Sequence, residues 1–158
     1  PAAGVTTRAM RNVRPIADMY GYYIAPGSGC QLLINECMHN IATLRATLSA
    51  NKDGATIDPL SYRPRSFRAG YAVSLTDCTF SIIGPAALAA IIKQHRTTAR
   101  RLHLRRWYIG YWYDAKRRLH CLDLSIIVGK LSDALAIGKV TGQAAVFNFK
   151  TFNSIPVR

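Results

Sequence analysis

Hydrophobic and polar positions in the first third of the chain follow two different periods. Residues 19–25 (MYGYYIA) are rich in aromatic and β-branched side chains, which favours a strand, and the proline and glycines of 26–29 end it. Over 30–49 apolar positions recur every three or four residues, which predicts an amphipathic helix. The apolar positions of this helix are Ile34, Cys37, Ile41, Leu44 and Leu48. A turn at 51–54 and a short strand at 55–57 complete a strand–helix–strand unit.

The pattern changes after residues 58–69, a stretch with two prolines and three arginines that we expect to be a loop. Strand-like and helix-like periods then follow each other to the end of the chain. The expected elements are a strand at 71–75, a helix from Pro85 with Leu88, Ile91, Ile92 and His95 on one side, strands at 106–113 and 119–128, a helix capped by Ser132 and ended by Thr141 and Gly142, and a strand at 143–149.

The order of these elements predicts a fold class. From 70 to 150 it is strand, helix, strand, strand, helix, strand, which is the split βαβ (ferredoxin-like) pattern of an antiparallel sheet with two helices on one face. The unit at 17–69 would extend this sheet. We therefore expect one α+β domain over 17–158, preceded by a basic N-terminal arm at 1–16 and ending in a tail at 151–158.

Composition adds a strong charge imbalance to this picture. The 158 residues carry a formal net charge of +13 with only eight acidic residues, which a folded core does not require. Nucleic acid is the commonest partner of such a chain, and an anionic membrane surface is the second. The four cysteines are widely spaced, so we expect reduced thiols. No apolar run predicts a membrane span or a signal peptide, and we expect a soluble protein inside a cell or a virion.

The positive charge is concentrated in one segment. Residues 93–118 hold nine of the twenty-one basic residues and a single acid, Asp114. Its middle, 107–113, alternates aromatic and smaller residues like a strand, so cations and rings would lie together and contact phosphates and unpaired bases. The residues expected to bind nucleic acid are Lys93, Arg96, Arg100, Arg101, Arg105, Arg106, Trp107, Tyr111, Trp112, Lys116, Arg117 and Arg118.

The same segment also has a purely structural interpretation. In a half-buried strand every second ring faces the core, so some rings would pack on the helices while the arginines are simply solvated. A ribonucleoprotein-type RNA-binding domain carries further aromatic residues on its third strand, where this chain has Cys121, Asp123 and Ser125. The usual RNA-binding mode of such domains is therefore not expected.

An alternative hypothesis concerns catalysis. Cys30 follows the glycine-rich turn and opens a helix, where unpaired amides and the helix dipole stabilise a thiolate. His120 would act as its base, with Asp123 or Asn148 as the orienting group. A cysteine that caps a helix is commoner than a nucleophile, so no catalytic residue is assigned and Cys30, His120 and Asp123 stay an alternative.

Metal and cofactor sites are not expected. Cys37 and His39 lie on different sides of the predicted helix, and His120 and Cys121 are neighbours in a strand that face opposite ways. The eight acidic residues are scattered, unlike the carboxylate clusters of two-metal nucleases.

Three hypotheses follow for the function. The first is a non-enzymatic basic protein that binds DNA or RNA through its backbone, alone or with other subunits of a virion or nucleoprotein assembly. The second is an intracellular effector or toxin enzyme, either the cysteine hydrolase above or a metal-free ribonuclease using His103 or His120 with Arg105. The third is a structural module that docks on an acidic protein partner.

Overall fold

The computed structural model describes residues 30–76, 79–80 and 84–158. The predicted arm at 1–16 and strand at 19–25 lie outside these residues. The elements in chain order are α2 (Cys30–Ala50), β1 (Ala55–Ile57), β2 (Tyr71–Thr76), β3 (Thr79–Phe80), α3 (Pro85–Arg101), β4 (Tyr108–Asp114), β5 (Leu119–Val128), α4 (Leu131–Val140), β6 (Ala145–Asn148) and β7 (Asn153–Pro156). The expected α+β class is confirmed.

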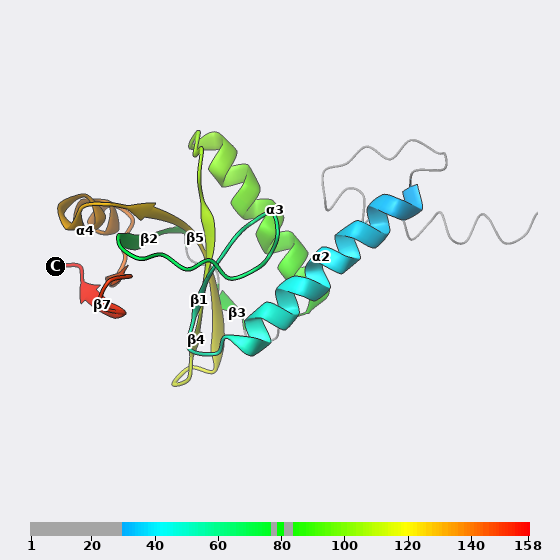
Figure 1. Cartoon of the computed structure of the whole chain (residues 1–158), viewed down its shortest axis with the longest axis horizontal. Coiled ribbons are helices and arrows are strands. Elements are labelled where there is room, and N and C mark those ends of the chain that lie inside the picture. Colours follow the sequence, from blue (N-terminus) through cyan, green and yellow to red (C-terminus); the bar gives the residue numbers. More distant parts are fainter. Residues whose placement is uncertain (1–29, 77–78, 81–83) are drawn as a thin grey trace, which may run out of the picture.

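The strands form one curled antiparallel sheet (Figure 1). Six of them lie in the order β1-β4-β5-β2-β6-β7, and β3 pairs with β5 outside this path. The hairpin of β4 and β5 is the longest pairing and runs through the middle of the sheet, with Tyr108 opposite Ser125 at one end and Asp114 opposite Leu119 at the other. The segments that enter and leave the hairpin at the Tyr108 end are therefore a full strand length away from the turn at the Asp114 end.

The register brings the apolar positions of the strands to one face. Ile57 lies opposite Ile109, Ile109 opposite Leu124, and Val73 opposite Ile126, so alternation along each strand puts these side chains on the same side. α2 and α3 pack against the part of this face that contains Ile57 and Ile109. α4 packs against the part that contains Val73.

Three expectations about boundaries are wrong. The tail at 151–158 contains β7, which pairs with β6 and forms an edge of the sheet. α4 begins at Leu131 with Lys130 at its N-cap and no side-chain cap, while the Ser132 hydroxyl bonds Asp133. β4 begins at Tyr108 because Arg105 and Arg106 belong to the turn that precedes it.

The predicted loop after β1 is compact. The carboxylate of Asp58 accepts hydrogen bonds from the backbone N–H groups of Leu60 and Ser61 at 3.0 and 2.9 Å, and Tyr62 N–H donates to the Asp58 carbonyl. Tyr62 itself is buried, with its carbonyl accepting a 2.9 Å bond from the Thr47 hydroxyl of α2. These contacts fix the loop between α2 and α3, where it forms one wall of the site described next.

Candidate functional site

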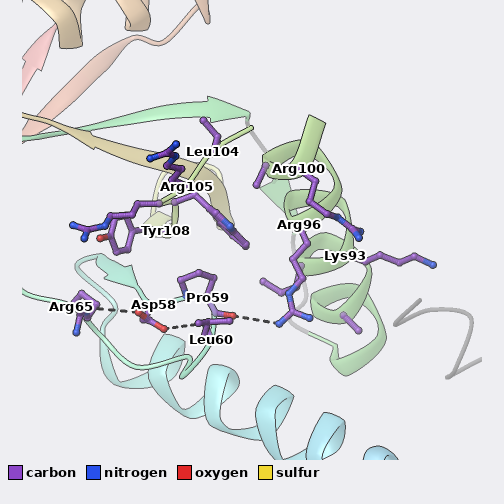
Figure 2. A pocket seen from close by; sticks show the side chains of 15 residues that line it. Asp58, Pro59, Leu60, Arg65, Lys93, Arg96, Arg100, Leu104, Arg105 and Tyr108 are labelled. Atoms are coloured by element: carbon purple, nitrogen blue, oxygen red, sulfur yellow. Dashed lines mark hydrogen bonds and ion pairs between the residues drawn. The ribbon is translucent and has the colours of Figure 1, made fainter. Parts of the chain in front are cut away.

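A cavity lies between this loop, α3 and the segment that enters β4 (Figure 2). Its volume is about 720 Å³, which is within the range of roughly 300 to 1,000 Å³ usual for binding sites. Its charged lining residues are Arg65, Lys93, Arg96, Arg100, Arg105, Arg106 and Asp58. Six cations thus surround one acid.

α3 supplies three of these cations because of its periodicity. Lys93, Arg96 and Arg100 are three and four residues apart and lie along one side of the helix, while Leu88 and His95 are buried on another. Pro85 occupies the first turn, where its missing N–H leaves no helical bond unmade.

The turn after α3 brings the next two cations to the cavity. His103 has a positive φ of 52°, its N–H donates to the Arg100 carbonyl, and the N–H of Leu104 donates to the Ala99 carbonyl. This pair of bonds is the Schellman motif, which ends a helix by reversing the chain. The reversal returns Arg105 and Arg106 alongside the last turn of α3.

Arg96 and Arg65 have defined partners within the protein. Arg96 donates from Nη2 to the Tyr62 hydroxyl at 2.8 Å and to the Pro59 carbonyl at 3.4 Å, so it fixes the loop to α3. Arg65 lies 3.9 Å from Asp58. Hydrogen bonds from Ser61 and Leu60 lower the pKa of Asp58, and Arg65 lowers it further, against the opposing effect of partial burial.

Three other cations of the cavity are exposed to solvent. Arg100, Arg105 and Arg106 are exposed, and their guanidinium groups make no hydrogen bond or ion pair with any residue that the structure describes. Arg101 is also exposed and without such a partner but does not line the cavity. The mouth of the cavity therefore carries positive charge that the described part of the chain does not neutralise.

The predicted binding residues divide into three groups in the structure. Lys93, Arg96, Arg100, Arg105, Arg106 and Trp107 line the cavity. Trp112, Lys116, Arg117 and Arg118 are exposed around the tip of the β4–β5 hairpin, at its other end. Arg117 lies 3.8 Å from Asp114, whose carboxylate also accepts two backbone N–H bonds of the hairpin turn.

Tyr111 forms the third group and belongs to the core. It is 4% exposed, packs with the residues beneath α3, and its hydroxyl lies in a 3.0 Å hydrogen bond with Nδ1 of His120. Burial raises the pKa of Tyr111. Its ring is therefore not available to stack on a base, and the structural interpretation of alternate rings applies to this residue.

The alternative catalytic residues are only partly covered by the described structure. Cys30 is the first residue of α2, and its side chain lies outside the described part. His120 lies opposite Tyr113 on the face with Tyr111, whereas Asp123, three positions along the same strand, points to the opposite face. Asp123 therefore does not orient His120. Burial lowers the pKa of His120.

Sequence reasoning did not identify the loop as one wall of the site. Asp58, Pro59, Leu60 and Arg65 all line the cavity. Residues 58–69 contain three arginines and two prolines, which marked them as a basic loop. Their sequence does not indicate that this loop folds against α3. Among the described residues no three histidine, cysteine, aspartate or glutamate side chains gather in a way that suits a metal ion.

Comparison with protein-family models, with curated protein sequences and with solved structures finds no match to this chain. Within the described residues, none of the helices combines the length and the apolar character needed to cross a bilayer.

Proposed function

We propose that this protein binds nucleic acid through the cavity and its basic mouth. The observation that carries the proposal is that Arg100, Arg105 and Arg106 line one cavity and have no hydrogen-bond or ion-pair partner among the described residues. Guanidinium groups form bidentate bonds with phosphate oxygens, and positive charge lining a hollow raises the local concentration of anions. Binding to the backbone in this way needs no catalytic group.

The hairpin tip provides a second, separate contact in this proposal. Lys116, Arg117 and Arg118 are exposed beside Trp112, so this end of the β4–β5 hairpin also presents cations and a ring to solvent. A nucleic acid that reaches both ends would lie along the hairpin. The ion pair of Arg117 with Asp114 makes this region the weaker of the two.

We further propose that residues 70–150 have the ferredoxin-like arrangement. The strand order β4-β5-β2-β6, with antiparallel neighbours throughout, supports it, because β2 and β4 flank β5 in the way a split βαβ unit requires. In this arrangement β1 and α2 are an extension that joins the sheet at β4.

The test of nucleic-acid binding is a charge-removal variant with a matched control. The triple variant Arg100→Ala, Arg105→Ala and Arg106→Ala removes three charges at the cavity. Lys130→Ala, Lys139→Ala and Lys150→Ala remove the same number of exposed charges around α4 and after β6, far from α3 in Figure 1. Filter binding or fluorescence anisotropy with single-stranded and duplex oligonucleotides would be measured at several salt concentrations.

We expect the arginine variant to lose at least about tenfold in affinity and the log–log salt slope to fall by about 2 to 3, since each phosphate contact contributes roughly 0.7 to 0.9. The lysine variant should keep most of its affinity. Equal losses in the two variants would mean that net charge alone attracts the nucleic acid, and the absence of binding by the unmodified protein would reject the proposal.

A further inference from the structure

The cavity has a feature that phosphate binding alone does not explain, which is a set of apolar residues in its lining. Ile92, Ala99 and Leu104 line it from α3 and the turn that follows, and Pro59 and Leu60 line it from the loop. Leu60 is 81% exposed. Ile92 and Ala99 are buried, so the apolar surface open to water comes mainly from Leu60, and a surface that only meets a charged backbone gains nothing from it.

Rings lie where the cavity meets β4. Trp107 lines the cavity while part of its ring packs against the core, and Tyr108 lines it next to Arg106. The ring of Tyr108 is held from behind by Phe67, with centroids 5.1 Å apart in an edge-to-face arrangement. Rings fixed in this way offer a flat surface at little entropic cost.

Charges and apolar surface are arranged in a definite order. The guanidinium groups of Arg100, Arg105 and Arg106 line the cavity without a partner among the described residues, and Figure 2 shows Arg100 and Arg105 on opposite sides of it. Arg96 is held between the loop and α3 by its bonds to the Tyr62 hydroxyl and the Pro59 carbonyl. The one acid, Asp58, is occupied by hydrogen bonds within its own loop and by Arg65. A fitting ligand therefore has a flat, largely apolar part and an anionic part at its edge.

We infer that the cavity receives an unpaired base of a single-stranded nucleic acid, while the flanking phosphates are held by the three arginines at the mouth. This inference rests on the proposed function and specifies its ligand. In a duplex the bases are stacked and paired inside the backbone, so a base enters such a cavity only after it has been flipped out. The structure thus favours single strands over blunt duplexes.

The experiment uses Trp107 as a reporter. The chain has two tryptophans, Trp107 and Trp112, and Trp112 is exposed on the hairpin, so Trp112→Phe leaves the reporter at the cavity alone. The full-length variant is titrated with a short single-stranded oligonucleotide, an abasic oligonucleotide of the same length and charge, a blunt duplex and a free nucleoside monophosphate. Tryptophan emission and anisotropy of a labelled oligonucleotide are followed together.

We expect the single strand to change Trp107 emission saturably and to bind at least about tenfold more tightly than the abasic strand, as stacking of a base on protein rings requires. The duplex should bind with little change in emission. Equal binding of the single and abasic strands would overturn the inference while leaving phosphate binding intact. Tighter binding of the free nucleotide than of the strand would also overturn it, and no binding of any strand would reject the inference together with the proposed function.

A second variant distinguishes the contribution of the apolar residues to binding from that of the charged residues. Leu60→Ser removes an exposed apolar side chain from the cavity, and Val140→Ser, at the end of α4, removes one of similar exposure elsewhere. Leu60→Ser should weaken binding of the normal strand several-fold and leave binding of the abasic strand unchanged. Val140→Ser should change neither. An equal loss for both strands in Leu60→Ser would show that the wall does not contact a base.

Discussion

At the scale of single residues, His103 determines where α3 ends and where the arginines after it lie. Its φ of 52° is in the left-handed region, where glycine is the usual residue and a side chain is strained. The flanking bonds from His103 to Arg100 and from Leu104 to Ala99 keep it there. His103 is a candidate base of the ribonuclease hypothesis, and this backbone geometry gives it a structural role at the end of α3.

Substitutions at His103 should reveal that strain. His103→Gly is expected to raise the free energy of unfolding by up to about 1 kcal/mol, whereas His103→Val, which is β-branched, should lower it by about 1 to 2 kcal/mol. Urea unfolding followed by circular dichroism measures both. If the two variants were equally stable, the left-handed turn would not be the conformation in solution.

For His95 the sequence predicted the side of the helix on which it lies, but not its hydrogen-bond partner. The spacing of Leu88, Ile91, Ile92 and His95 predicted that the histidine shares their side of α3, and it is 1% exposed. Its Nε2 donates to the carbonyl of Leu122, 3.2 Å away and on another element. Its Nδ1 has no hydrogen-bond partner among the described residues.

The burial of His95 gives a pH dependence of stability. Desolvation lowers its pKa below the ordinary 6.5, although the bond to Leu122 opposes this. The folded protein keeps the ring neutral while the unfolded chain takes up a proton as the pH falls through about 6.5, so the free energy of unfolding is highest above that pH and decreases below it. His120 contributes with the same sign.

His95→Gln should reduce this dependence, because glutamine retains a donor for the Leu122 carbonyl and does not titrate. Thermal unfolding would be compared at pH 7.5 and 5.5, and the difference in Tm between these pH values should be smaller in the variant than in the unmodified protein. An unchanged difference would assign the pH dependence to other groups.

At the scale of elements, the loop from Asp58 to Arg65 positions the site by long-range contacts. Arg96 of α3 bonds the Tyr62 hydroxyl at 2.8 Å, and Thr47 of α2 bonds the Tyr62 carbonyl, so one tyrosine joins three segments. Periodicity predicted the helices and strands because each has one buried side. It did not predict this loop, since its place depends on residues more than thirty positions away.

Tyr62→Phe tests the contribution of that contact. It removes the hydroxyl that accepts from Arg96. A hydrogen bond to a charged group is worth about 1.5 to 3 kcal/mol when buried, so a loss of about 1 to 2 kcal/mol is expected because the Arg96 side of this bond is partly exposed. Tyr113→Phe is the matched control, because no hydrogen bond joins its exposed hydroxyl to the described residues, and it should change stability by less than about 0.5 kcal/mol.

At the scale of the whole molecule, the positive charge is divided between the two ends of one hairpin. The sequence showed this charge as one continuous segment, and the length of β4 separates it into the cavity and the hairpin tip. The ion pairs of Arg65 with Asp58 and of Arg117 with Asp114 offset little of the chain's net charge of +13. Repulsion between like charges therefore opposes folding at low ionic strength.

Salt should consequently stabilise the protein while it weakens nucleic-acid binding. The Tm is expected to rise between 20 and 200 mM sodium chloride, and to rise less in the variant that lacks Arg100, Arg105 and Arg106. Differential scanning fluorimetry measures both proteins in parallel. A Tm that falls with salt would show that attraction, not repulsion, dominates the charges of the folded chain.

The last strand has a consequence for solubility. β7 is mostly exposed, contains Pro156, and lies between β6 and water. A short proline-containing strand is a poor template for a neighbouring molecule, whereas bare β6 would offer unpaired N–H and C=O groups beside the ring of Phe147. β7 thus covers the edge of β6, and removing β7 is expected to promote edge-to-edge aggregation before it unfolds the core.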